Sequence, residues 1–250
     1  MIIVTGGAGF IGSNFILKFL EASNENLLNL DNLSYAANLS NLKTINTDPR
    51  YSFTKINIQN QSEVEEIVKE VKPRAILNFA AESHVDRSIE GPESFINTNI
   101  LGTYSLLEAA LNYWNDLDES GKKIFRFFHI STDEVFGSLD INDKKSTEES
   151  SYKPNSPYSA SKAASDHLVR AWHHTFKLPT LVSNCTNNYG PHQHEEKLIP
   201  LIITKALKND NLPIYGDGKN IRDWLYVEDH CEAIMKILEN GNPGETYNIG

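Results

Sequence analysis

The sequence predicts an α/β protein built on a doubly wound parallel sheet, with a small C-terminal region beside it. Short apolar runs of strand length alternate with segments of helical spacing along the chain. A glycine-rich turn at 6–12 separates the first apolar run from the first helical segment. Beyond Asn187 the alternation is broken by Gly190-Pro191 and Leu212-Pro213, which fits a small region closing over the carboxyl edge of the sheet.

The expected elements follow in order from the N-terminus. Residues 1–4 form an apolar run suited to a buried parallel strand, and apolar side chains between 15 and 20 then recur at helical spacing. A second strand is expected at 27–31. We expect further strands at 51–55, 74–79, 125–130 and 180–183, helices at 62–71, 95–112 and 158–176, and loops at 117–123 and 140–153.

The glycine turn predicts a nucleotide-binding site. Gly6, Gly9 and Gly12 have the spacing that permits a tight turn and close approach of the backbone to a pyrophosphate at a helix N-terminus. Asp31 ends the second strand, where a carboxylate could bind ribose hydroxyls and repel a 2′-phosphate. Strand, glycines, helix and acid in this order therefore predict a Rossmann-like fold that binds NAD rather than NADP. The alternative is a structural turn followed by a surface aspartate.

Composition and charge favour a cytoplasmic enzyme that acts on small molecules. The net charge is −10 without a cluster of lysine and arginine, so no nucleic-acid partner is expected. No apolar segment approaches membrane-spanning length and no signal-like region opens the chain, so no membrane partner is expected. Cys185 and Cys231 give no disulfide framework, and we expect buried, reduced thiols. His192 and His194 lack a third spaced ligand set, so no metal is expected.

One of three Tyr-x-x-x-Lys pairs has a geometry suited to catalysis. The pair at 51 and 55 lies in an expected strand, where four residues separate side chains by about 13 Å. The pair of Tyr215 and Lys219 spans a Gly-Asp-Gly turn. Tyr158 and Lys162 begin an expected helix, where positions i and i+4 are neighbours. A cationic Lys162 near the phenol would favour its ionised form, so Tyr158 could take a hydroxyl proton during oxidation.

Two adjacent carboxylates, Asp133 and Glu134, follow the strand expected at 125–130. Thr132, just before them, would hydrogen-bond the same substrate oxygen as Tyr158. A simple alcohol dehydrogenase needs the phenol and the lysine but not two carboxylates, so the pair predicts that loss of water accompanies the redox step. The two carboxylates could instead lie at the end of a strand without a role in catalysis, but the carboxyl edge of such a sheet is where ligands bind.

Several stretches of the chain match a known enzyme family. They are 5–13, 31–36, 80–89, 132–135, 158–162, 187–191, 196–200 and 216–224. Through them nearly the whole chain resembles the extended short-chain dehydrogenase/reductase family, and within it the dTDP-glucose 4,6-dehydratases. The glycine motif is shared by many sugar-nucleotide enzymes. The Thr-Asp-Glu triplet at 132–134 is more selective, because sugar epimerases lack both carboxylates there.

The resemblance implies NAD-dependent conversion of dTDP-glucose to dTDP-4-keto-6-deoxyglucose. Tyr158, assisted by Thr132 and Lys162, would deprotonate the glucose 4-hydroxyl while hydride passes from C4 to NAD. Glu134 would then remove the C5 proton as a base, and Asp133 would protonate the departing C6 hydroxyl. Return of the hydride to C6 would complete the reaction.

The resemblance also implies which residues bind each ligand. NAD would contact Gly6, Gly9, Phe10, Ile11, Gly12, Asp31, Asn32, Ser34, Asn57, Ile58, Ala80, Ala81, Tyr158 and Lys162. The nucleotide sugar would contact Ser83, His84, Asp86, Thr132, Asn187, Glu196, Lys197, Asn220 and Arg222. A homodimer is also implied, built by packing the helices 95–112 and 158–176 against their mates.

Departures from the family pattern leave other functions open. Asn57 stands where the family usually has Asp, Asn184 where it has Arg, Glu195 where it has Pro, and Phe136 where it has Tyr. We expect an NAD-binding domain at 1–186 with 221–240 returning to it. We expect a substrate-binding region at 187–220 and 241–250, incomplete because family members usually continue further. The alternatives are another NAD-dependent sugar-nucleotide dehydratase, decarboxylase or epimerase, or an inactive NAD-binding protein.

Overall fold

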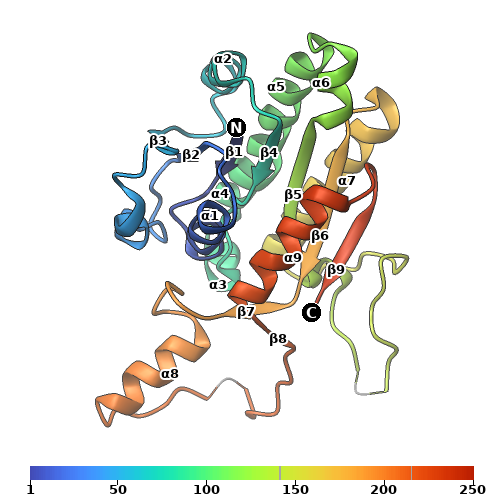
Figure 1. Ribbon diagram of the computed structural model, residues 1–250. Helices are drawn as coiled ribbons and strands as arrows, with labels where there is room; N and C mark the ends of the chain where they lie inside the picture. The colour runs from blue at the N-terminus through green and yellow to red at the C-terminus, as the bar shows by residue number, and fades with distance from the viewer. Residues whose placement is uncertain (141, 215) are drawn as a thin grey trace.

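The computed structural model describes residues 1–140, 142–214 and 216–250, and its main feature is a parallel sheet. Seven strands of this described part form the sheet in the order β3-β2-β1-β4-β5-β6-β9, with every neighbouring pair parallel (Figure 1). They are β1 (Ile2–Thr5), β2 (Leu27–Asp31), β3 (Tyr51–Lys55), β4 (Ala75–Asn78), β5 (Arg126–Thr132), β6 (Thr180–Cys185) and β9 (Thr246–Ile249). The predicted doubly wound sheet is confirmed, and the strand order reverses between β1 and β4.

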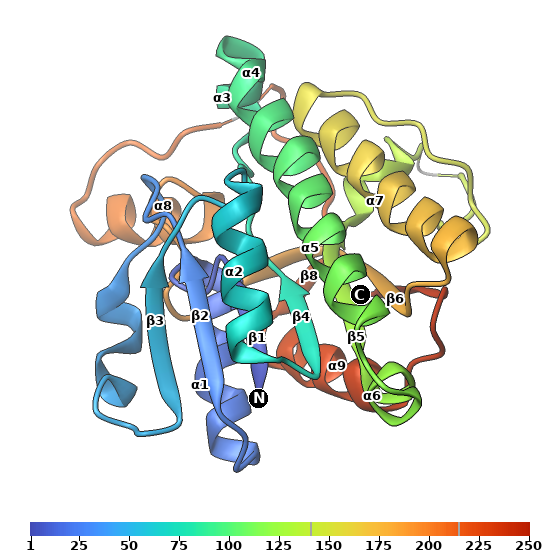
Figure 2. The same ribbon diagram turned by 90° about the horizontal axis from the view of Figure 1, so that it is seen from above.

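Helices cover both faces of the sheet because the central strands are apolar on both sides. The helices α2 (Gln61–Val71), α5 (Thr103–Asn115) and α7 (Pro157–Phe176) lie side by side on one face (Figure 2). The helices α1 (Phe10–Ala22) and α9 (Val227–Asn240) cover the other face. Successive strand residues point to opposite sides, so Ile3 joins the first layer and Ile2 the second.

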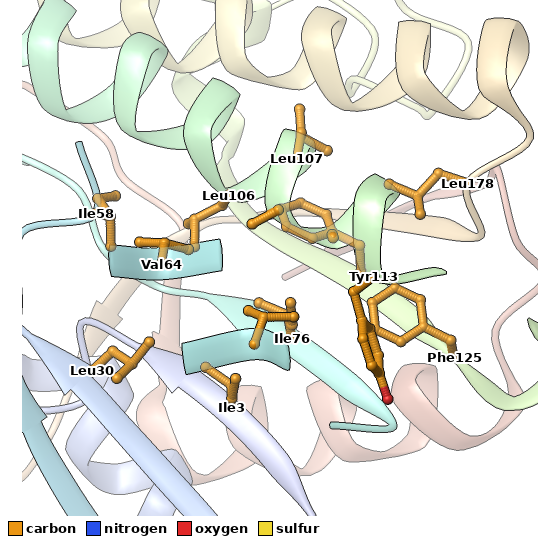
Figure 3. Packing of buried hydrophobic residues seen from close by; sticks show 14 of the residues in the cluster. Ile3, Leu30, Ile58, Val64, Ile76, Leu106, Leu107, Tyr113, Phe125 and Leu178 are labelled. Carbon is orange, nitrogen blue, oxygen red and sulfur yellow. The ribbon is translucent and has the colours of Figure 1, made fainter. Parts of the chain in front are cut away.

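The layer under α2 and α5 is a continuous apolar cluster. In it Val64 of α2 and Leu106 of α5 pack with Ile3 and Ile76 from the sheet, and all four are fully buried (Figure 3). This packing fixes the carboxyl ends of the strands relative to α5 and α7. The strand ends are where the predicted site residues lie.

Shorter elements connect the main ones. They are η1 (Leu39–Ile45), α3 (Val85–Glu90), α4 (Pro92–Phe95), η2 (Ile96–Gly102), α6 (Glu119–Ile124), η3 (Asp133–Phe136), β7 (Asn187–Tyr189), α8 (Leu198–Leu207) and β8 (Trp224–Tyr226). The loop predicted at 117–123 is wrong, because Asp118 caps the start of α6 by accepting the Gly121 amide at 2.7 Å. The helix predicted at 95–112 begins as the π-helical segment η2.

The C-terminal part differs from the expected division in one respect. Residues 246–249 form β9, which pairs with β6 and so extends the main sheet, whereas 241–250 are expected in the substrate-binding region. The strands β7 and β8 pair with each other in a separate small sheet, and α8 stands apart from the main body (Figure 1). None of the described helices is long and apolar enough to cross a membrane.

Candidate active site

A pocket of about 450 Å³ opens at the carboxyl edge of the sheet, at the reversal of strand order. It brings together most of the predicted residues: Gly6, Gly9, Phe10, Ile11, Gly12, Asp31, Asn32, Ser34, Ile58, Ala80, Ala81, Ser83, Thr132, Glu134, Tyr158, Lys162, Asn187, Glu196, Lys197 and Arg222. The predicted residues Asn57, His84, Asp86, Asp133 and Asn220 do not line its wall. Segments from both ends of the chain therefore meet in one cavity.

The glycine turn leaves room for a ligand at the start of α1. Gly6 has φ +71°, and a Cβ there would lie 2.6 Å from the Ala80 amide nitrogen. A Cβ at Gly12 would collide with the Gly6 carbonyl. Gly9 precedes α1 without a side-chain cap, so the first amides of this helix can bind an anion.

Asp31 lines the pocket and also stabilises the glycine turn. Its side chain is buried at the end of β2, where Oδ2 accepts the Ala8 amide at 2.9 Å and Oδ1 accepts the Leu33 amide at 2.8 Å. Burial raises the pKa of this carboxyl, and the two backbone hydrogen bonds oppose that shift. The reading as a mere surface aspartate is wrong, because Asp31 both faces the pocket and holds the glycine turn.

The start of α7 places Tyr158 and Lys162 on one buried face. Ser156 and Ser159 form a reciprocal capping box, and Pro157 occupies the first turn, so the helix begins at a fixed point. Burial, followed by the charge of Glu134, raises the pKa of Tyr158 well above its usual value, while the Thr132 hydroxyl lowers it. The expected net lowering is therefore not found in this structure.

The Tyr51–Lys55 pair does not form a comparable site. Tyr51 lies in β3, as predicted, and its hydroxyl accepts a hydrogen bond from Asn29 Nδ2 at 3.1 Å. Tyr215 lies outside the described residues. Neither Tyr51 nor Lys55 lines the pocket.

The carboxylates of Asp133 and Glu134 lie in different electrostatic surroundings. The side chain of Thr132 accepts the Glu134 amide at 3.3 Å and so starts η3 directly at the end of β5. Burial raises the pKa of both carboxyls. The charge of Asp133 raises the pKa of Glu134 further, while Lys197 and Arg222 lower it. The Thr132 hydroxyl and Arg222 lower the pKa of Asp133, while Asp223 raises it.

Glu196 links three segments at the pocket through contacts that the sequence does not reveal. Its carboxylate accepts the Tyr35 hydroxyl at 3.2 Å and lies 3.6 Å from an Arg87 nitrogen and 3.7 Å from His84 Nε2. The Arg87 guanidinium also stacks 3.7 Å above the Tyr35 ring. Next to this cluster, Lys197 Nζ donates to the Ser83 carbonyl at 3.4 Å.

A polar network below Tyr158 and Lys162 is a second feature that the sequence motifs did not predict. Lys162 Nζ donates to the Ile130 carbonyl at 2.8 Å and lies 3.3 Å from His129 Nε2, which is 3.4 Å from Asp166 Oδ1. All three side chains are buried. The signal was available, because Asp166 follows Lys162 by four residues and shares its helix face.

The described residues contain no group of three His, Cys, Asp or Glu side chains placed to hold a metal ion. Cys185 and Cys231 are free and buried, as predicted. Burial raises the pKa of each thiol to about 12. Both are therefore protonated at neutral pH and unreactive.

The site is a nucleotide-binding oxidoreductase-type site of the extended short-chain dehydrogenase/reductase class. Three features define it: the doubly wound sheet, the glycine turn with Asp31, and the buried Tyr158–Lys162 pair. The family model described as GDP-mannose 4,6 dehydratase matches residues 3–250. The dTDP-glucose 4,6-dehydratase of Haemophilus influenzae is 54% identical over 249 residues, which cover 100% of this chain and 74% of that protein. The enzyme of the same name from Xanthomonas campestris pv. campestris is 56% identical over 248 residues, covering 99% of this chain and 70% of that protein. The chain belongs to the dTDP-glucose 4,6-dehydratase family.

Solved structures agree with this assignment. The crystal structure of dTDP-glucose 4,6-dehydratase from Bacillus anthracis in complex with NAD has a TM-score of 0.89 and 47% identity, covering 100% of this chain and 74% of that one. The structure of DesIV, a dTDP-glucose 4,6-dehydratase from Streptomyces venezuelae with NAD and TYD bound, has a TM-score of 0.92 and 44% identity, covering 100% of this chain and 75% of that one.

Proposed function

We propose that this chain catalyses the NAD-dependent dehydration of dTDP-glucose to dTDP-4-keto-6-deoxyglucose. The observation that carries the proposal is that Glu134 and the buried Tyr158 line one pocket, with a second carboxyl, Asp133, next to Glu134 at the end of β5. Epimerisation would need the redox pair but neither carboxylate. Relatives that are 54% and 56% identical bear the name of this activity.

The residues around the glycine turn fit NAD. The amides at the start of α1 suit the pyrophosphate, and close approach there depends on the absence of side chains at Gly6 and Gly12. Asp31 supplies a carboxylate for the ribose hydroxyls and against a 2′-phosphate. NAD, when bound, supplies a hydride acceptor for the oxidation and a hydride donor for the final reduction. Two solved relatives were determined with NAD.

Tyr158 is the proposed base for the 4-hydroxyl of the sugar. Its pKa lies well above its usual value, so the phenol needs help to lose its proton. Thr132 lowers the pKa by hydrogen bonding, and the buried ammonium of Lys162 supplies positive charge on the same helix face. The three residues act as one unit, with Tyr158 alone exchanging a proton with substrate.

Glu134 and Asp133 are the proposed base and acid of the elimination. Lys197 and Arg222 favour the ionised form of Glu134, which suits removal of the C5 proton. The charge of Asp223 favours the protonated form of Asp133, which suits donation to the departing C6 hydroxyl. Burial and Arg222 act on both carboxyls, so the assignment of opposite roles is supported by Lys197, which acts on Glu134, and by Asp223, which acts on Asp133.

The nucleotide-sugar contacts are proposed for the other side of the pocket. Lys197 and Arg222 line it together with Asn187 and Glu196, and their cationic groups suit the diphosphate. Ser83 lines the same wall. His84, Asp86 and Asn220 stay predictions as substrate contacts, as does Asn57 as a cofactor contact, because they lie off the pocket wall.

A homodimer through η2, α5 and α7 is also proposed. Ile96, Leu101, Tyr104 and Phe176 lie on these helices and are between 38% and 50% exposed. Such a set of exposed large apolar side chains on adjacent helices suits burial against a second copy. Sedimentation equilibrium tests this, and a monomer at micromolar concentration would contradict it. A cytoplasmic location stays a prediction.

Incubation with dTDP-glucose tests the proposed activity. We expect a 4-keto-6-deoxy product, detected by its absorbance in alkali and by mass, without net NADH formation. The Glu134→Gln variant should lose between about a hundredfold and ten-thousandfold of this activity, the range typical for removal of a general base. Net NADH release, or turnover only with a UDP-, GDP- or CDP-sugar, would show that the substrate or reaction is wrong.

A further inference from the structure

Asp166 is a buried carboxylate whose direct partners carry no fixed positive charge. It is 3% exposed, and Oδ2 accepts hydrogen bonds from Ser131 Oγ at 2.9 Å, Tyr152 Oη at 3.0 Å and Asn184 Nδ2 at 3.1 Å. Its other oxygen, Oδ1, lies 3.4 Å from His129 Nε2. An ionised carboxylate in such a place requires a counter-charge as well as hydrogen bonds.

The nearest source of that charge is Lys162. It is the one lysine or arginine among the buried residues of the described ranges, and it lies one turn before Asp166 on α7. His129 stands between the two, with Nε2 at 3.3 Å from Lys162 Nζ and at 3.4 Å from Asp166 Oδ1. Asn184 offers Asp166 only a neutral amide. In this chain the lysine and the carboxylate therefore balance each other.

His129 has a defined hydrogen-bonding state in this arrangement. Its Nδ1 lies 3.1 Å from Asn78 Nδ2, and the other amide atom, Asn78 Oδ1, accepts the Thr5 hydroxyl at 2.7 Å. The Asn78 amide therefore donates to Nδ1, which leaves the imidazole proton on Nε2, the ring nitrogen that lies between Lys162 Nζ and Asp166 Oδ1. Burial, and next the charge of Lys162, lower the pKa of His129 to about 4, so the ring is neutral near pH 7.

We propose that Asp166 is a positioning residue for the catalytic pair: its carboxylate, held by Ser131, Tyr152 and Asn184 and separated from Lys162 only by the neutral His129 ring, is the counter-charge that keeps the Lys162 ammonium in the protein interior beside Tyr158. This inference rests on the proposed function only for its link to turnover. The same carboxylate ties Ser131 of β5 to α7, and Ser131 immediately precedes Thr132.

The pKa of Lys162 is set by two opposing effects, burial and the charge of Asp166. Burial lowers the pKa of Lys162 to about 8, and Asp166 is the largest influence that raises it. The titratable groups facing the ammonium are His129 from β5, Cys185 from β6, and Tyr158 and Asp166 from α7. Of these, His129 and Cys185 are neutral near pH 7 and the pKa of Tyr158 is raised, so the Asp166 carboxyl is the remaining group that can oppose the charge of Lys162.

The test measures the ionisation of Lys162 directly by NMR of lysine labelled at Cε and Nζ, with the signal assigned through a Lys162→Arg variant. In Asp166→Asn we expect Lys162 to titrate at least about one pH unit lower than in the wild-type chain, the smallest effect expected of a close opposite charge. Tyr152→Phe is the matched control, because it removes one hydrogen bond to Asp166 and leaves the charge. Its Lys162 should titrate as in the wild type. An unchanged titration in Asp166→Asn, or equal shifts in both variants, would overturn the proposal.

Two further measurements keep the proposal falsifiable if Asp166→Asn does not fold. Asp166→Ser removes the charge and leaves room for water among the three donors, and the same lowered titration is expected. In the wild-type chain, the ¹⁵N shifts of His129 must show a neutral ring protonated at Nε2, and a positively charged His129 would overturn the proposal, because the ring itself would then balance Asp166. Neither readout needs substrate, so failure of the proposed reaction is seen separately. Where turnover is found, the alkaline limb of kcat against pH should move down with the Lys162 titration.

Discussion

His230 should make the stability of this protein fall steeply in mild acid. The side chain is fully buried on α9, and its Nδ1 lies 2.8 Å from Asn188 Oδ1, while Asn188 Nδ2 donates to the Thr186 carbonyl. Nδ1 therefore carries the proton of the neutral ring. Nε2 is buried and has no hydrogen-bond partner among the described residues, so a proton added there would be both unsolvated and unpaired.

The size of the effect follows from the pKa of His230. Burial lowers it from 6.5 to about 4, which corresponds to about 3 kcal/mol at 1.36 kcal/mol per pKa unit. The unfolded chain takes up a proton near pH 6.5 and the folded chain only near pH 4. The stabilisation is therefore complete above pH 6.5 and is lost as the pH falls to about 4. Against a typical total of about 5–15 kcal/mol, this loss is large.

Urea unfolding of wild type and His230→Asn across this pH range measures the effect. Asparagine keeps a donor near Asn188 but cannot titrate, so the variant should lose about 3 kcal/mol less on acidification from pH 6.5 to pH 4. His129, whose pKa is also about 4, contributes equally to both proteins and cancels in the difference. His192→Asn, at an exposed left-handed position with φ +68°, should follow the wild type. Equal pH dependence in wild type and His230→Asn would refute the reasoning.

Three other substitutions test the pocket. Gly12→Ala should lower the stability by about 1–3 kcal/mol and weaken NAD binding, measured by thermal unfolding with and without NAD, whereas Gly91→Ala should be tolerated because its Cβ would come no closer than 3.9 Å to other atoms. Asp31→Asn should improve the NADP-to-NAD affinity ratio about tenfold in calorimetric titrations, because it removes the charge that repels a 2′-phosphate; an unchanged ratio would contradict that role. Arg87→Ala should raise the KM for the sugar by no more than about fivefold at constant kcat. The arginine is half exposed, and such ion pairs contribute at most about 1 kcal/mol. A large fall in kcat would instead show that Arg87 takes part in the chemical step.

Local patterns predicted the framework of the fold. The apolar runs that became β1, β4, β5 and β6 and the helical spacing of α2 and α7 depend on neighbouring residues, so they are visible in a single sequence. The helix α6 was missed because its cap, Asp118, opens a polar stretch that resembles a loop. The register of β9 against β6 depends on residues some sixty positions apart and could not be read locally.

Sequence motifs predict the residues of the site but not the contacts that join them. The glycine turn, Asp31 and the Tyr158–Lys162 pair carry recognisable spacings, and all of them line one pocket. The contacts of Glu196 with Tyr35 and Arg87 join segments distant in sequence and required the tertiary structure. The pKa of Tyr158 could not be foreseen either, because its direction is set by burial, which no motif records.

The capped start of α7 has a consequence for the phenol of Tyr158. The helix runs for 20 residues from Pro157, so its aligned peptide dipoles place about half a positive charge at the N-terminal end. Tyr158 lies in that first turn, and helical side chains lean toward the N-terminus. The backbone thus contributes a positive potential at the phenolate, and deprotonation cannot remove this potential. Unlike the ammonium of Lys162, whose pKa is about 8, this contribution persists in alkaline solution.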